Sequence, residues 1–365
     1  QRQMCIRDRV YLDWNATAPL RSEARDAMLA ALDVAGNPSS VHAEGRAARA
    51  IVERARGEVA ALVGCKPGEV VFTSGATEAA GMLSRVPEGH DVLVDETAHD
   101  AVWAHVRMDG WPEAPRGPGH TLAMGVANSE TGVITEPPEM LDGQYPFGEA
   151  RADWLFLDVT QAVGRLPWSF HWSGAHFACL SAHKLGGPKG VGALIVKDGV
   201  DIGALQAGGG QELGRRSGTE NVAGIAGFGA ACTAAARDLE AGVWGEVEKL
   251  RNILESTLAS EAKETIFVGK DMRRLPNTSC FATPGWKGET QVMQMDLEGF
   301  AVSSGSACSS GKVKAPRVLQ AMGLSAGSAE GALRVSLGPA TGEDDVLRFA
   351  EAWLRHEKKF RQRAA

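Results

Sequence analysis

The chain has 365 residues, a length that suits two domains, and its 44% hydrophobic and 23% charged residues are typical of a soluble globular protein. The net charge of −7 argues against a nucleic-acid partner, because phosphate binding requires a basic surface. No apolar run reaches the ~18 residues of a membrane helix, and the six cysteines are scattered without metal-ligand spacing, so we expect a cytoplasmic protein with reduced thiols, no membrane contact and no metal.

The N-terminal part predicts one short strand and two helices. Residues 1–9 are polar and basic and are interpreted as a non-native or disordered extension. The stretch Tyr11–Pro19 predicts a strand that enters a turn, and a helical pattern follows from Ser22 to Leu32. Apolar residues at helical spacing then predict a second helix within His42–Val63.

The stretch from Val70 to Glu78 predicts a strand that breaks at a small-residue turn, with a helix starting at once. Free backbone N–H groups and the positive end of a helix dipole make such a turn a phosphate site. The backbone of Ala76 and the side chain of Thr77 are the candidate donors. An ordinary strand-to-helix turn is the alternative.

Strands and helices alternate as far as Val196, which predicts an α/β fold with a mostly parallel sheet and helices on both faces. Ligands of such sheets bind at the carboxyl ends of the strands. The polar residues expected at those ends are Thr77, His99, Asn128, Asp158 and Lys184.

Lys184 is the main candidate for a catalytic residue. It follows the apolar run Phe177–Leu180 and precedes a glycine-rich turn, so its amine would be partly desolvated and free to form a Schiff base. Asp158 ends another buried strand, and a carboxylate there suits the pyridine nitrogen of pyridoxal 5′-phosphate (PLP). A surface lysine beside a turn is the alternative for Lys184 taken alone.

Other polar residues fit the same cofactor. Gln161 lies where its amide would reach the ring hydroxyl, and the segment Ser181, Ala182 and His183 offers phosphate donors beside the lysine.

The motifs Asp158–Gly164 and Ser181–Lys184 resemble those of the class V aminotransferases and, within that group, the cysteine desulfurases of iron–sulfur cluster assembly. The resemblance runs from Tyr11 to about Glu343. It implies a PLP enzyme of fold type I.

The resemblance also implies roles for single residues. His99 is implied to lie on the pyridine ring and relay protons, Asn128 to reach the cofactor hydroxyl and the substrate, and Asn15 to lie at the substrate entrance. In the glycine-rich loop Gly208–Asn221, Thr219 is implied to bind the phosphate of a neighbouring subunit's cofactor, which predicts a homodimer.

The C-terminal part predicts a smaller α+β domain. A long helical stretch from Asn221 to Ala259 is expected to connect a large PLP-binding domain, residues 10–240, to a small domain, residues 241–365. Residues 10–18 are also candidates to pack with the small domain. Its expected elements are strands at Asn277–Ala282 and Ala301–Ser304 and helices at Arg317–Met322 and Glu343–Arg355.

Two further residues carry chemistry. Cys308 lies in the serine- and glycine-rich stretch Ser303–Gly311, which predicts an exposed loop where the thiol can act as a nucleophile. Arg334 interrupts an apolar run, and a substrate carboxylate is a natural partner for its guanidinium.

These patterns together predict a PLP-dependent cysteine desulfurase. It would convert L-cysteine to L-alanine, with the sulfur passing to Cys308 as a persulfide and then to a sulfur-acceptor protein such as an iron–sulfur scaffold. Another class V enzyme, such as an aminotransferase, selenocysteine lyase or C–S lyase, would not need Cys308. A non-catalytic scaffold or sulfur-carrier partner is the second alternative. The proline-rich stretch Trp111–Gly119 and the pair Pro137–Pro138 depart from the family pattern and leave the acceptor unidentified.

Overall fold

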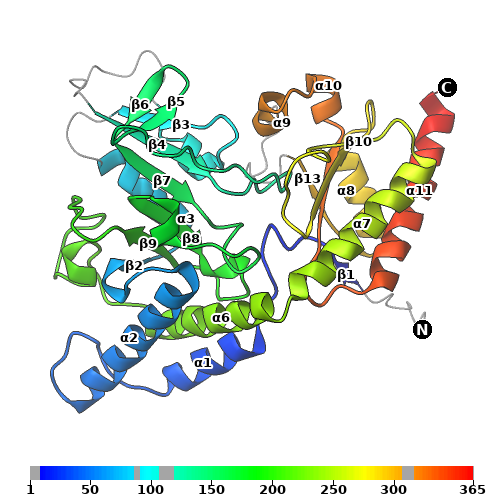
Figure 1. Cartoon of the computed structure of the whole chain (residues 1–365). Coiled ribbons are helices and arrows are strands. Elements are labelled where there is room, and N and C mark those ends of the chain that lie inside the picture. Colours follow the sequence, from blue (N-terminus) through cyan, green and yellow to red (C-terminus); the bar gives the residue numbers. More distant parts are fainter. Residues whose placement is uncertain (1–8, 86–90, 107–118, 306–315, 365) are drawn as a thin grey trace, which may run out of the picture. The chain divides into compact units, whose positions relative to one another are not determined.

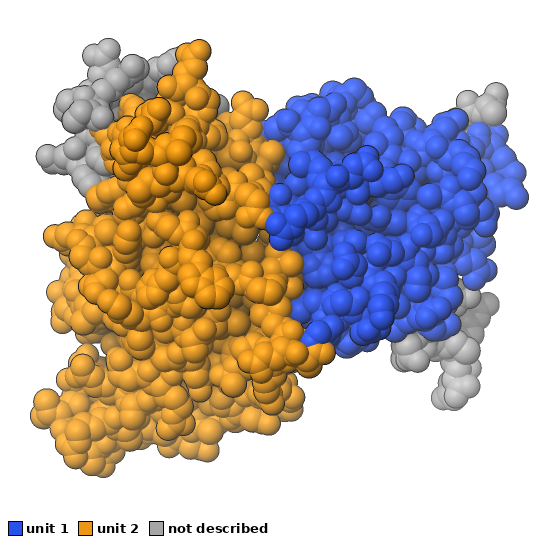
Figure 2. All heavy atoms as spheres, viewed as in Figure 1, with its two compact units in different colours: residues 1–17, 128–134, 242–365 blue, residues 18–127, 135–241 orange. Residues whose placement is uncertain are grey.

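The computed structural model describes residues 9–85, 91–106, 119–305 and 316–364, which form two compact units (Figures 1 and 2). Unit 1 comprises Gln1–Thr17, Asn128–Ile134 and Gly242–Ala365. Unit 2 comprises Ala18–Ala127 and Thr135–Ala241. Unit 1 therefore takes up three separate segments of the chain.

Unit 2 is built on a six-stranded sheet in the order β2-β9-β8-β7-β4-β3. The pairs β3/β4, β4/β7 and β7/β8 are parallel, and β9 is antiparallel to both its neighbours, β2 and β8. Five strands thus share one direction, which confirms the mostly parallel sheet. The strands are β2 Val70–Thr73, β3 Asp91–Val94, β4 His120–Gly125, β7 Trp154–Asp158, β8 Phe177–Ser181 and β9 Gly192–Val196.

Helices cover both faces of this sheet, as expected. Successive side chains of a strand point to opposite faces of the sheet. On one face, Phe72 of β2 packs edge-on against Phe228 of α6. On the other face, Val71 lies in a core cluster with Ala79 of α3 and Val102 of α4. In Figure 1, α1 and α2 pack with α6. The helices are α1 Ser22–Leu32, α2 Ala43–Val63, α3 Ala76–Ala80, α4 Asp100–Trp103, α5 Phe170–Ser173 and α6 Val222–Glu240, and a hairpin joins β5 Tyr145–Phe147 to β6 Ala150–Ala152.

Local sequence signals explain the bounds of α2. The His42 side chain accepts a hydrogen bond from the Gly45 backbone N–H and caps the first turn. Gly64 ends the helix in the left-handed conformation, with φ of 66°, which favours glycine. Buried residues recur at helical spacing along one side of α2, namely Ala48, Val52, Ala55, Val59 and Val63.

The single helical stretch expected from Asn221 to Ala259 is in fact two helices, α6 and α7 (Val243–Glu261). Gly242 separates them with φ of 71°, a left-handed conformation that a continuous helix does not contain. The boundary between the two units falls at this glycine.

Unit 1 contains a four-stranded antiparallel sheet in the order β10-β11-β14-β13, with a separate parallel pair of β1 and β12. Both strands and both helices expected in this region are present, although Ala301–Ser304 is divided between β12 and β13. The elements are β1 Val10–Tyr11, β10 Ile266–Phe267, β11 Thr278–Ala282, β12 Phe300–Ala301, β13 Ser303–Ser304, β14 Ala332–Ser336, α7, α8 Gly288–Leu297, α9 Arg317–Ala321, α10 Ala326–Ala329 and α11 Glu343–Ala364.

Trp353 of α11 is central to the core of unit 1 and is fully buried. Its ring lies 5.2 Å from that of Phe281 and 5.4 Å from that of Trp286, measured between centroids. Its indole N–H donates to Gln291 Oε1 at 2.9 Å, so the one polar atom of the ring is satisfied. Among all described helices, none is both long and apolar enough to span a membrane.

Candidate active site

The cofactor candidates of unit 2 lie at one edge of its sheet. Because β2, β3, β7 and β8 share a direction, their carboxyl ends meet there. Thr77 follows β2, His99 follows β3, Asp158 ends β7 and Lys184 follows β8. Asn128, the fifth residue expected at this edge, belongs to unit 1.

Lys184 ends a single 3-10 turn, Ala182–Lys184, that directly follows β8. The turn is tight because the N–H groups of Leu185 and Gly187 both donate to Ala182 O, at 3.1 and 2.9 Å. A Cβ atom at Gly187 would lie 2.9 Å from the Ala182 Cβ, so only glycine fits there without a shift. The lysine itself is half-buried.

The residues proposed to bind phosphate are partly brought together. Ser181 Oγ accepts a hydrogen bond from the Ala76 N–H at 2.8 Å, which joins the β8 end to the turn after β2. Burial, followed by the charges of Lys184 and Lys189, lowers the pKa of His183 to about 4. His183 is therefore neutral at pH 7 and lies in surroundings that favour an anion.

The helix that begins at Ala76 has only five residues. Its dipole is correspondingly small, so the helix-dipole part of the sequence argument is weaker than expected. Local N–H and hydroxyl groups remain as donors, and the Thr77 side chain is exposed.

Asp158 is held in place at the end of β7. Its Oδ1 accepts the Thr160 N–H at 3.0 Å, and in the parallel register it lies opposite Cys179 of β8. Complete burial, and then the Asp158 charge, raise the pKa of the Cys179 thiol well above its ordinary value.

His99 caps α4: its Nδ1 accepts the Ala101 N–H at 3.1 Å. This contact fixes Nδ1 as the unprotonated nitrogen and leaves the proton of the neutral ring on Nε2. Capping is a structural role that does not by itself involve a cofactor. Stacking on a cofactor ring stays a prediction.

The glycine-rich loop is anchored by a residue that sequence analysis missed. Glu212 is 7% exposed and receives Arg56 Nη1 and Nη2 at 2.8 and 2.7 Å, and its Oε2 also accepts the Phe72 N–H at 2.8 Å. The forked contact with Arg56 ties the loop to α2, and the Phe72 N–H ties it to β2. Thr219, further along the loop, is exposed.

The substrate candidates Asn15, Asn128 and Arg334 all belong to unit 1. Arg334 is 1% exposed and donates to Ser129 O at 3.0 Å. Asn15 donates to the same carbonyl at 3.2 Å, and Asn128 Oδ1 accepts the Glu130 N–H at 2.9 Å. The three residues therefore meet at the turn that follows Asn128.

Arg334 already has a charged partner, which corrects the sequence argument. Asp13 Oδ1 lies 2.7 Å from Arg334 Nη2, so a substrate carboxylate is not needed to compensate the buried guanidinium. Arg334 Nε is buried and has no hydrogen-bond partner within the described residues. Sequence reasoning missed Asp13 because 321 residues separate the pair.

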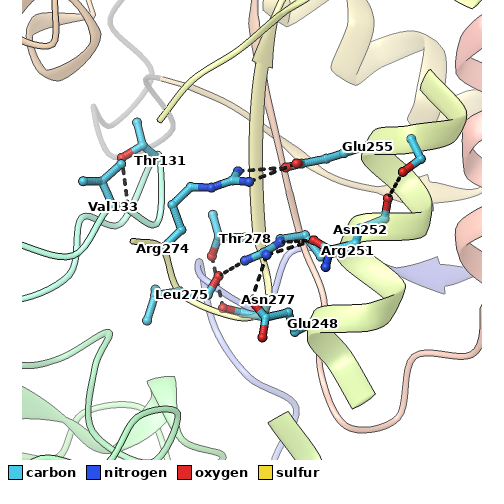
Figure 3. A network of polar contacts seen from close by, with 11 residues as sticks. Thr131, Val133, Glu248, Arg251, Asn252, Glu255, Arg274, Leu275, Asn277 and Thr278 are labelled. Carbon is cyan, nitrogen blue, oxygen red and sulfur yellow. Dashed lines mark hydrogen bonds and ion pairs between the residues drawn. The ribbon is translucent and has the colours of Figure 1, made fainter. Parts of the chain in front are cut away.

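Polar contacts in this part of unit 1 also join α7 to residues 274 and 275 (Figure 3). Asn15 donates to Thr278 Oγ1 at 2.9 Å and accepts from Asn277 Nδ2 at 3.2 Å. Beside these residues, Arg251 donates to Leu275 O at 2.6 Å. Asn15 is consequently held on both polar atoms of its amide and is 1% exposed.

Cys308 lies outside the described residues. The four described cysteines are all free, and burial raises the pKa of each thiol, to about 12 for Cys65 and Cys280 and well above the ordinary value for Cys179 and Cys232. None of these four is a thiolate near neutral pH. The described part of the chain also contains no cluster of acidic, His and Cys side chains suited to a metal ion.

Comparisons with known proteins place this arrangement in a family. The model of the class-V aminotransferases matches residues 10–109 and 120–349. A cysteine desulfurase of Frankia sp. is 40% identical, with 95% of this chain and 90% of the relative covered. Another from Cereibacter sphaeroides is 36% identical over 94% of each, and the cysteine desulfurase IscS of Dictyoglomus turgidum is 34% identical over 92% of this chain and 91% of its own.

Solved structures agree with the sequence relatives. The NifS-like protein of Rickettsia africae has a TM-score of 0.82 and 26% identity, with 95% of this chain and 99% of that chain covered. A second NifS-like protein has the same TM-score and 28% identity, over 96% and 99%.

Proposed function

This chain belongs to the class-V aminotransferase family and is a cysteine desulfurase of that family, and we propose how its own residues share the work. L-cysteine is converted to L-alanine, and the sulfur passes to Cys308 as a persulfide. The observation that carries this proposal is the common sheet edge at which Asp158 and Lys184 end or follow adjacent parallel strands.

The proposed cofactor is PLP, and the donor set fits it. The Ala76 N–H is used by Ser181 Oγ, so the donors left for a phosphate dianion are the proton of the Ser181 hydroxyl and neutral His183. Asp158 suits the pyridine nitrogen and the Lys184 amine suits the aldehyde. Thr77, Gln161, Ala182 and His99 complete the proposed contacts. Bound there, PLP would supply the electron sink for chemistry at the substrate's α-carbon.

The protein residues then move protons and sulfur. Lys184 carries a proton to and from the α-carbon, and His99 exchanges one through Nε2, because Nδ1 is occupied by the cap. The Cys308 thiolate forms a bond to the substrate sulfur as the substrate's C–S bond breaks. The electron pair of that bond stays with the carbon, which takes up a proton and becomes the methyl group of alanine.

Cys308 is proposed as the sulfur acceptor partly by elimination. The raised pKa of Cys65, Cys179, Cys232 and Cys280 makes each of them a poor nucleophile. Of the chain's six cysteines, Cys5 lies in the N-terminal segment that matches no motif, so Cys308 remains.

Arg334 is proposed to bind the substrate carboxylate, with Asn15 and Asn128 beside it. We expect Arg334→Lys to raise KM for L-cysteine about tenfold, because losing one charge-assisted hydrogen bond costs about 1.5 kcal/mol. An ammonium cannot hold Asp13 and Ser129 O and also present a further donor in the guanidinium plane. Steady-state alanine formation measures KM.

Arg251→Lys is the matched control for Arg334→Lys. Arg251 is another buried arginine of unit 1 that donates to a backbone carbonyl and pairs with a carboxylate, Glu248. The Arg251→Lys variant should unfold more easily than wild type, with no change in KM for L-cysteine. A KM for Arg334→Lys equal to that of wild type would assign Arg334 a structural role only.

We also propose a homodimer and a location in the cytoplasm. The exposed Thr219 lies on a loop whose base is anchored by Glu212, which suits contact with the phosphate of a second subunit. Sedimentation of the purified protein would give the mass of the dimer.

The four free cysteines of the described residues agree with a reducing compartment such as the cytoplasm. The sulfur acceptor is proposed to be a protein, such as an iron–sulfur scaffold.

The test of the function uses purified protein with PLP and L-cysteine. We expect equimolar alanine and, with a thiol reductant present, sulfide. Addition of a keto acid should not change the rate, because no amino group is transferred. Dependence on a keto acid would identify an aminotransferase, pyruvate and ammonia in place of alanine would identify a C–S lyase, and a preference for selenocysteine would identify a selenocysteine lyase. A colourless, inactive protein would identify a scaffold.

A further inference from the structure

The backbone around Lys184 is held by hydrogen bonds from other segments of unit 2. Four successive backbone carbonyl groups, from His183 to Gly186, each accept a hydrogen bond from a more distant residue. His183 O accepts Ala18 N at 2.8 Å, Lys184 O accepts Arg165 Nη2 at 3.1 Å, Leu185 O accepts Arg21 Nε at 2.9 Å, and Gly186 O accepts Arg21 N at 2.9 Å.

Arg21 clamps one side of this turn. Its guanidinium also pairs with Asp238 of α6 at 2.5 Å, which fixes its direction. A Cβ atom at Gly186 would lie 2.6 Å from Arg21 Cγ, and Gly186 has φ of 89°. Glycine at this position therefore permits both the left-handed backbone and the close approach of the arginine.

Arg165 holds the Lys184 carbonyl of this backbone and also contacts the side chain of Gln161. It is 3% exposed, and while Nη2 donates to Lys184 O, Nη1 donates to Gln161 Oε1 at 2.5 Å. A guanidinium has donors only, so the Gln161 atom that faces it must be the oxygen. One rigid planar group thus fixes the orientation of the Gln161 amide and the position of the Lys184 backbone.

Arg165 also lies in the segment that follows Asp158 and β7. Its N–H donates to Ala162 O at 3.0 Å, directly after Gly164, which has φ of 77°. A Cβ at Gly164 would lie 3.0 Å from Ala235 Cβ of α6. The guanidinium consequently connects the segment that follows β7 to the turn that follows the neighbouring parallel strand β8.

We propose that Arg165 is a positioning residue that fixes the Lys184 amine relative to Gln161 and Asp158 for reaction with the cofactor. The proposal rests on the proposed function, because it assumes that PLP binds at this edge. The lysine side chain must move during turnover, whereas its backbone must stay in one place. Hydrogen bonds to the backbone carbonyls fix the backbone and leave the side chain free to move.

The experiment measures how apo-protein reacts with PLP, without any substrate. Wild type, Arg165→Met and Arg165→Lys are mixed with PLP, and the bond to Lys184 is trapped with borohydride at successive times and quantified by mass spectrometry. We expect the rate constant to fall about tenfold or more in Arg165→Met, because misplacing a reacting group by about 1 Å can cost up to a hundredfold. Arg165→Lys should lie between the two.

Arg251→Met is the matched control, since Arg251 is a buried arginine of unit 1 that also holds a backbone carbonyl. Both methionine variants should lower the melting temperature of the apo-protein, but only Arg165→Met should slow trapping. A wild-type trapping rate in Arg165→Met, or an equal slowing in Arg251→Met, would show that Arg165 is merely structural.

Two further outcomes are decisive. If Arg165→Met does not fold, Arg165→Lys decides the matter: slower trapping supports the proposal, and an unchanged rate overturns it. If wild-type protein takes up no PLP, the proposed cofactor itself is wrong, and the wild-type measurement alone reveals it.

Discussion

A Lys184→Ala variant is expected to form no covalent bond with PLP and to lose alanine formation by about a thousandfold or more, the range expected when a proton-transfer group is removed. Lys184 is half-buried and ends a turn whose backbone is clamped on four carbonyls. The alanine variant keeps those backbone contacts, so the fold should persist. Borohydride reduction followed by peptide mapping measures the bond.

Lys189→Ala is the control for this prediction. Lys189 is exposed, lies five positions further along, and contributes positive charge near His183 in the same way that Lys184 does. It should keep the label on Lys184 and most of the activity. Label found on Lys189 in wild type, or on no lysine, would contradict the assignment.

The second large effect is expected from Cys308→Ala. This variant should bind PLP as wild type does, yet form alanine at least about a hundredfold more slowly and carry no persulfide, because no thiolate is present to attack the substrate sulfur. Mass spectrometry of the intact protein after reaction with L-cysteine detects the added sulfur. Absorbance of the bound cofactor confirms that the site is loaded.

Cys65→Ala is the matched control, because Cys65 is the one described cysteine that is not fully buried, and its pKa is raised to about 12. It should retain both alanine formation and the persulfide. Alanine formed at the wild-type rate by Cys308→Ala would remove the desulfurase mechanism and favour a C–S lyase.

The sequence by itself determined the helices α1 and α2 and the strand ends that carry the main candidates of unit 2, but not the end of α6. Apolar runs and helical periodicity are local properties, and so are caps such as His42 and Gly64, so α1 and α2 lie where their patterns predict. The placement of Asp158 and Lys184 at strand ends was equally local. The local pattern was therefore enough to place these two residues at one edge of the sheet, and their roles toward a cofactor stay predictions.

Only the tertiary structure decided which side chains meet across long stretches of chain. The reversed direction of β9, the pairing of Asp13 with Arg334 and the contact of Arg21 with Leu185 O involve residues that no periodicity relates. Burial forces such pairings, because a guanidinium removed from water needs partners wherever the fold brings them. Arg165 illustrates the limit: its position in the sequence marks an ordinary turn, and its role follows only from the packing of β7 beside β8.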